Sequence, residues 1–217
     1  MTSQLWVLIG NGVLETLQMT VSATILAYLI GLPIGIALVV TAKEHILQNR
    51  IVNLVLGVLM NIFRSIPFLI LLVVLIPFTR FVTGSSIGTT ATIVPLTVGA
   101  IPIVARMVES SLKEVPSGIV EAAQSMGASP ISIIFRFIIP EAMPSLLLGA
   151  TINLATVLGY SAMAGCIGGG GLGAIALNYG YYRYQQDILF ITVAILIIIV
   201  QVFQESGTLL ANKKRHS

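Results

Sequence analysis

Apolar residues gather in long continuous runs along this chain, and short polar stretches separate the runs. A helix needs roughly 20 residues to cross a hydrocarbon core of about 30 Å, and these runs are of that order. Helices are predicted because backbone groups left unpaired in lipid are costly, and the alternation of a barrel strand is absent. The five predicted spans lie near 17–41, 52–79, 91–108, 142–165 and 187–210.

The composition agrees with this pattern. Of 217 residues, 56% are hydrophobic and 9% are charged, and the mean hydropathy is +1.01. Such values lie far outside the soluble range and predict an all-α integral membrane protein, with residues 1–217 forming a single transmembrane domain. The first run is too long for a cleavable signal, no Lys or Arg precedes it, and Glu15 stands just before it, so it is expected to remain as a membrane helix.

The basic residues predict the orientation, because loops rich in Lys and Arg tend to stay in the cytoplasm. A cytoplasmic C-terminus leaves only Arg80 and Arg183 outside, so the N-terminus is predicted outside and residues 109–141 inside. The basic residues that this arrangement places in the cytoplasm are Lys43, Arg50, Arg106, Lys113, Arg136, Lys213, Lys214 and Arg215. The net charge of +3 then indicates contact with anionic lipid head groups, and no nucleic-acid partner is expected.

A polar segment, residues 115–140, lies between the third and fourth spans and is predicted to form a short helix, a turn and a second helix. Pro116 suits a first helical turn, Gly127 stops the helix, and Ser129 with Pro130 restarts it as N-cap and first residue. Four residues recur at helical spacing and form a small apolar face: Ile119, Ala122, Ala123 and Met126. Such a helix can lie in a groove of a partner, whereas an ordinary interfacial helix is the alternative.

The same segment resembles the coupling loop of ABC-importer permeases, which carries Glu-Ala-Ala, three residues, Gly, nine residues and then Ile-x-Leu-Pro. The matching residues are Glu121, Ala122, Ala123, Gly127 and Pro140. Phe137 replaces Ile and Ile139 replaces Leu, and both remain apolar. The resemblance implies that residues 121–127, including Met126, dock an ATPase and transmit its motion, and the Glu121 carboxylate offers a charged hydrogen bond.

ATP hydrolysis is expected on a separate subunit, because no lysine here follows the Gly-x4-Gly pattern of a phosphate-binding loop. ATP and Mg²⁺ would be bound by that ATPase, and no cofactor is expected in this chain. The glycines at 168–173 lack such a lysine, and two interpretations stay open for them: a flexible outer connection or a plain loop. No metal site is predicted, since Cys166 is the single cysteine and His45 and His216 are far apart in sequence.

Polar residues inside the predicted spans are the pathway candidates. Arg64 should face the bundle interior or a water-filled cavity, and either a pathway role or a lock on the kink at Pro67 would explain it. In 157–173, Tyr160, Ser161 and Met163 are candidates for the pathway or gate, and a filler of irregular packing is the alternative for Met163. The polar amides are expected to form helix-to-helix hydrogen bonds: Gln18, Asn53, Asn61 and Asn153.

A second resemblance rests on FRSIP, residues 157–173, NYGYYRYQQD and the five spans. Together they make nearly the whole chain similar to the methionine-uptake permease family. The resemblance implies a homodimer in the bacterial inner membrane, with two copies of an ATPase and an extracytoplasmic methionine-binding protein. It implies import of D- and/or L-methionine by alternating access, without covalent chemistry. A permease for another solute is the alternative. A membrane enzyme or stand-alone channel is disfavoured because the spans lack a nucleophile, a His pair and an acidic cluster.

Overall fold

The computed structural model describes residues 3–215, and these residues form helices and their connections without a strand. The described chain divides into two compact units. The first unit comprises Met1–Ala27, Ile66–Ala100 and Asn153–Gln204, and the second comprises Tyr28–Ser65, Ile101–Ile152 and Glu205–Ser217. The expected all-α fold is confirmed, whereas the single transmembrane domain stays a prediction. His216 lies outside the described residues.

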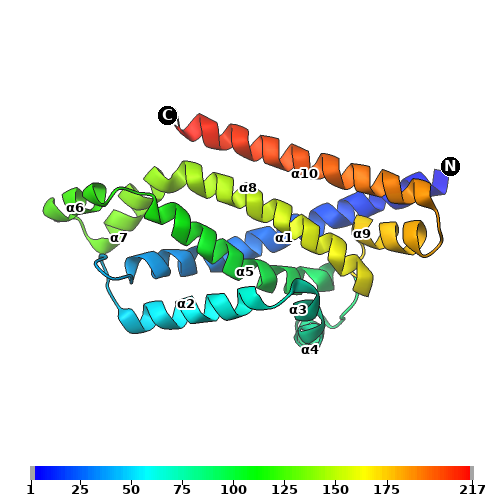
Figure 1. The fold of residues 1–217 in the computed structure, drawn as a ribbon, viewed down its shortest axis with the longest axis horizontal. Coiled ribbons are helices and arrows are strands. Elements are labelled where there is room, and N and C mark those ends of the chain that lie inside the picture. Colours follow the sequence, from blue (N-terminus) through cyan, green and yellow to red (C-terminus); the bar gives the residue numbers. More distant parts are fainter. Residues whose placement is uncertain (1–2, 216–217) are drawn as a thin grey trace. The chain divides into compact units, whose positions relative to one another are not determined.

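Four continuous helical stretches are long and apolar enough to cross a membrane, and a fifth candidate is a bent pair. Three of the stretches are α1 (Ser3–Val40), α5 (Thr89–Lys113) and α10 (Gln186–Arg215). The fourth runs through α7 (Pro130–Ile133), the π-helical turn η1 (Ile134–Ile138) and α8 (Ile139–Ala164). The five predicted spans each fall on one of these candidates (Figure 1).

The second candidate span is broken at Pro67. α2 (Arg50–Ser65) ends before Pro67, and α3 (Phe68–Val74) begins after it as a separate helix. Proline has no N–H to continue the helical ladder, and the Ser65 hydroxyl donates a 2.7 Å hydrogen bond to the Asn61 carbonyl in the last turn of α2. The predicted kink is therefore a complete break. A short helix, α4 (Ile76–Thr83), follows and ends at Gly84, which has φ 76°.

In the second unit α1, α2 and α5 pack together around the buried residues Leu38, Met60 and Ala105. Small residues bring α1 and α5 close, as a Cβ on Gly35 would lie 2.6 Å from the Cβ of Val108. The Asn53 amide of α2 donates to the Leu38 carbonyl of α1 at 2.6 Å, which confirms its predicted helix-to-helix role.

In the first unit the glycine-rich connection packs tightly against α1. The Glu15 carboxylate accepts the Gly171 amide at 2.7 Å, and the Thr16 hydroxyl accepts the Leu172 amide at 2.9 Å. These bonds cap α9 (Gly171–Ile175), which continues into the π-helical turn η3 (Ala176–Tyr181). Gly171 has φ 72°, and a Cβ there would lie 2.6 Å from the Thr16 hydroxyl oxygen, so the close approach requires glycine.

The same contact explains why α1 is longer than predicted. The sequence placed the first span near 17–41, after Glu15, whereas α1 begins at Ser3. A carboxylate is tolerated inside this helix because the backbone amide of Gly171 donates a hydrogen bond to it.

Candidate functional site

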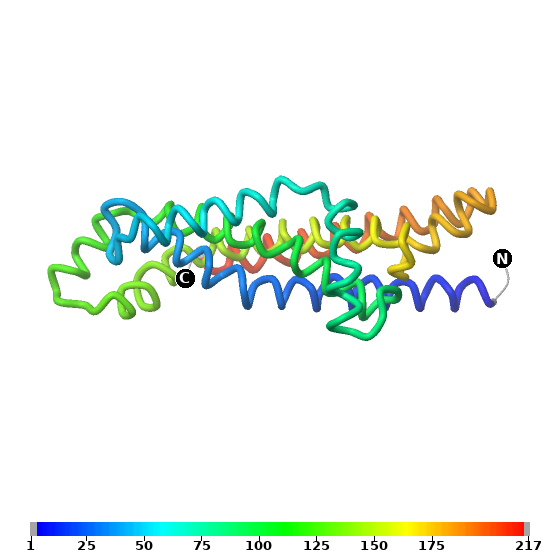
Figure 2. Tube along the Cα trace, turned by 90° about the horizontal axis from the view of Figure 1, so that it is seen from below, coloured from blue at the N-terminus to red at the C-terminus, as the bar shows by residue number. Residues whose placement is uncertain are grey.

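The segment between α5 and α8 has the predicted helix, turn and restart. α6 (Ser117–Ser125) begins after Pro116, which precedes the helix instead of lying in its first turn. Gly127 turns the chain with φ 76°, and the Ser129 hydroxyl accepts the Ser132 amide at 3.3 Å as the cap of α7. Figure 2 traces α6 and α7 as a protruding loop of the second unit.

The α6 surface differs from the predicted apolar face. Ala123 is fully buried, whereas Ala122, Glu121 and Met126 are exposed, Met126 by 71%. The helical spacing predicted that Ala122 and Ala123 share one apolar face. In the structure the Ala123 side chain is buried in the protein, whereas the Ala122 side chain faces solvent. The surface available to a partner is therefore formed by Glu121, Ala122 and Met126, with Gly127 at its end.

Gly127 has open space around it, because no atom lies within 4 Å of an ideal Cβ built at this position. Its amide donates to the Gln124 carbonyl at 2.9 Å, and the Ala128 amide donates to the Ala123 carbonyl at 3.1 Å. These bonds satisfy carbonyls of the last α6 turn and require a left-handed residue. The glycine is thus needed for its backbone and not for lack of space.

A cavity of about 250 Å³ lies beside α6. It is lined by the α1–α2 connection with Glu44 and His45, by Lys113 at the end of α5, and by Glu121 and Gln124 of α6. Burial and then the nearby Lys113 charge lower the pKa of His45 below its ordinary value of 6.5. The His45 Nδ1 atom is buried and has no hydrogen-bond partner among the described residues.

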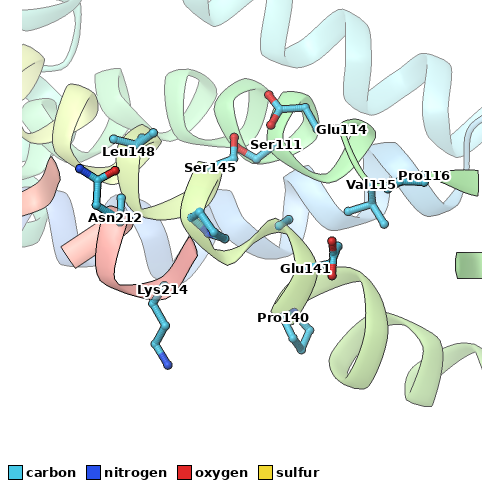
Figure 3. A pocket seen from close by; sticks show the side chains of 13 residues that line it. Ser111, Glu114, Val115, Pro116, Pro140, Glu141, Ser145, Leu148, Asn212 and Lys214 are labelled. Carbon is cyan, nitrogen blue, oxygen red and sulfur yellow. The ribbon is translucent and has the colours of Figure 1, made fainter. Parts of the chain in front are cut away.

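A larger cavity of about 720 Å³ is lined by the end of α5, the start of α8 and the end of α10. The Ser145 hydroxyl donates to the Ser111 hydroxyl at 3.0 Å in its wall. Figure 3 shows Glu114 and Glu141 on different elements, with the Lys214 ammonium directed away from both carboxylates. The cavity is polar and open, and no group of three potential metal ligands occurs in the described part of the chain.

Sequence reasoning missed a charged network between α5 and α2. One Arg106 nitrogen lies 2.6 Å from a Glu109 oxygen, and the other donates to the Gly57 carbonyl at 2.9 Å and to the Asn61 side-chain oxygen at 2.8 Å. Lys113 lies 2.7 Å from the second Glu109 oxygen. Arg106 was predicted only as a cytoplasmic charge, although the i, i+3 and i+4 spacing of Arg106, Glu109 and Lys113 is typical of ion pairs on a helix.

Two further amides that were expected to join helices, Asn61 and Asn153, differ in their contacts. Asn61 makes the expected helix-to-helix bond, with Arg106 as its donor. Asn153 is fully buried on α8, and neither of its side-chain polar atoms has a partner within residues 3–215.

Arg64 is exposed near the end of α2. In the described structure its guanidinium makes no hydrogen bond to the broken helix end, where the Ser65 hydroxyl bonds instead. No contact therefore supports the predicted role of Arg64 in stabilising the helix end at Pro67. Its role in the transport pathway stays a prediction.

The three candidates on α8 lie in different environments. The Tyr160 ring stacks on Phe68 of α3, with centroids 4.0 Å apart and planes 5° from parallel. Ser161 is buried and donates to the Leu158 carbonyl at 2.7 Å, whereas Met163 is 46% exposed. Ser161 thus serves its own helix, and Met163 is the side chain of the three that is available to another molecule.

Comparison with known proteins gives one consistent family. Residues 27–211 match the model of "Binding-protein-dependent transport system inner membrane component". A probable D-methionine transport system permease of Vibrio cholerae is 50% identical over 202 residues, covering 93% of this chain and 90% of that protein. Its counterpart in Pasteurella multocida is 49% identical over 216 residues, covering both chains completely.

A solved structure has the same fold. A chain of the MetNI methionine ABC transporter, in an inward-facing conformation, superposes with a TM-score of 0.97 at 45% identity and 99% coverage of both chains. This chain therefore belongs to the binding-protein-dependent transport system inner membrane components, the multi-pass permeases of ABC importers.

Proposed function

We propose that this protein is the permease subunit of an ATP-driven importer that carries methionine, as the D- and/or L-isomer, across the cytoplasmic membrane. The observation that carries the proposal is the full-length likeness to permeases named for D-methionine, at about half identity, together with the TM-score of 0.97. The exposed α6 surface at Glu121, Ala122 and Met126 supports it, because such a permease must present a docking element.

The transporter is a homodimer of this chain with two copies of an ATPase subunit, which binds ATP and Mg²⁺, and an extracytoplasmic methionine-binding protein. The relative of known structure is a chain of a methionine ABC transporter. Five spans are few to enclose a route for an amino acid, and two copies around a two-fold axis provide ten. The N-terminus lies outside and the C-terminus in the cytoplasm, which puts α6 within reach of the ATPase.

Transport proceeds by alternating access, with nucleotide shifting the balance between states open to either side. ATPase movement reaches the permease through the exposed face of α6, and the chain leads from there into α5. Methionine is released unchanged, so no residue of the permease acts as a nucleophile or a general base. The pathway candidates for mutagenesis remain Met163, Tyr160, Ser161 and Arg64.

The test is uptake of labelled methionine by proteoliposomes that contain this chain, its ATPase and its binding protein. Saturable accumulation that requires hydrolysable ATP and is selective over other amino acids is expected. Competition by unlabelled D- and L-methionine then gives the isomer preference. An assembled complex that hydrolyses ATP but accumulates another solute would overturn the substrate, and flux without ATP would overturn the importer.

A further inference from the structure

The Arg106 tie, defined as the bonds from Arg106 to Glu109, Gly57 and Asn61, joins two helices whose residues are far apart in sequence. Arg106 and Glu109 lie on α5, and the acceptors Gly57 and Asn61 lie on α2. The Arg106 side chain is 24% exposed and that of Glu109 is 11% exposed. A guanidinium can hold three acceptors in a fixed geometry because its donors form a rigid planar fork.

Among the described residues, the polar side-chain contacts that join α2 to α5 all come from Arg106, whereas the Asn53 amide joins α2 to α1. Met60 is the single buried residue of α2 among those described, and most of its apolar side chains are exposed, with Ile51 at 75% and Leu54 at 62%. In lipid these exposed groups give no force toward α5, because the acyl chains are as apolar as they are. Polar contacts therefore decide how firmly α2 follows its neighbours.

α5 is also the helix that leads directly to α6. It ends at Lys113, and α6 begins at Ser117, so the residues 114–116 form the entire connection. The Glu114 and Val115 amides still bond to carbonyls of the last α5 turn, which extends its order into the connection. A displacement of α6 can therefore be transmitted to α5 through a connection that is short and ordered.

We propose that Arg106 is a positioning residue for transport: together with Glu109 it makes α2 move with α5 when the ATPase displaces α6. This inference rests on the proposed function. The guanidinium ties α2 to the driven helix, and the break at Pro67 marks the end of the segment that is moved. Cutting the tie leaves ATP hydrolysis in place and lowers the transport that each hydrolysed ATP produces.

The experiment compares Arg106→Lys, Asn61→Ala and Lys113→Gln in the reconstituted complex. Lysine at 106 keeps the charge beside Glu109 but lacks the fork that reaches α2, and Asn61→Ala removes one acceptor on α2. Lys113→Gln is the matched control, because it removes the other ion pair of Glu109 and leaves every α2 contact intact. Methionine accumulated per ATP hydrolysed is measured for each, with complex yield and melting temperature.

We expect Arg106→Lys to lower methionine per ATP by roughly threefold to tenfold, as for loss of polar contacts between membrane helices, with Asn61→Ala intermediate and Lys113→Gln unchanged. If the Arg106→Lys complex accumulates as much methionine per ATP hydrolysed as the unmodified complex, at equal yield, the proposed role of the Arg106 tie is overturned. A purely structural role predicts lower yield or melting temperature at an unchanged ratio. If the unmodified complex accumulates no methionine, the proposed function has failed instead.

Discussion

At the scale of single residues, a substitution at Gly127 tests the effect of backbone strain without steric crowding. We expect Gly127→Ala to weaken the turn after α6 by roughly 1–2 kcal/mol, because an L side chain is disfavoured at φ 76° even in open space. The membrane helices should stay folded while less ATPase copurifies with the permease. Gly118→Ala is the control, since Gly118 also has open space but lies in the helix without a positive φ. Equal ATPase recovery from both variants would contradict the prediction.

His45 predicts a pH dependence of stability. Its folded pKa lies below the ordinary 6.5, so the group is held neutral, and its contribution to stability is present above that value and declines as the pH falls below it. Lys113 opposes the charged form, while Glu44 and Glu121 line the same cavity. The melting temperature of the unmodified protein should therefore fall more steeply below about pH 6.5 than that of His45→Gln. If the melting temperatures of the two proteins depend on pH in the same way, titration of His45 does not affect stability.

At the scale of elements, the contact between α1 and α5 depends on small residues. Leucine at Gly35 would meet Val108 and the Ala105 carbonyl at under 3 Å, so the helices must separate. We expect a loss of about 1–3 kcal/mol, seen as a lower melting temperature. Gly10→Leu, on the same helix with nothing within 4 Å, should have little effect. A comparable loss in both variants would indicate a general intolerance of α1 to leucine.

The elements were predictable to the extent that they depend on local properties. The five apolar runs, a kink at Pro67 and the restart at Ser129 follow from short stretches of sequence, whereas the kink proved to be a complete break. The start of α1 and the Arg106 tie were not predictable in this way, because Glu15 finds its partner 156 residues away and Arg106 finds Gly57 49 residues away. Ala123 was assigned to the wrong surface because helical periodicity gives a face without saying what covers it.

At the scale of the whole molecule, the proposed orientation makes opposite predictions for two exposed positions. In a Cys166→Ser background, cysteine at Tyr184 should react with a membrane-impermeant maleimide in intact cells, because this residue is 88% exposed and is placed outside. Cysteine at Ser125 on α6 should react only in inverted vesicles. Reaction of Ser125→Cys in intact cells would reverse the orientation and remove α6 from the side that holds ATP.

The capping of α9 by α1 has a consequence for building chimaeras of related permeases. Glu15 and Thr16 accept amides of Gly171 and Leu172, and the glycines leave no room for a larger residue. Segments 12–19 and 168–175 therefore form one exchangeable part, although more than 140 residues separate them. A hybrid that takes one segment from a relative with a different residue at 15 or 171 inherits a buried mismatch, whereas a hybrid that takes both inherits a matched pair.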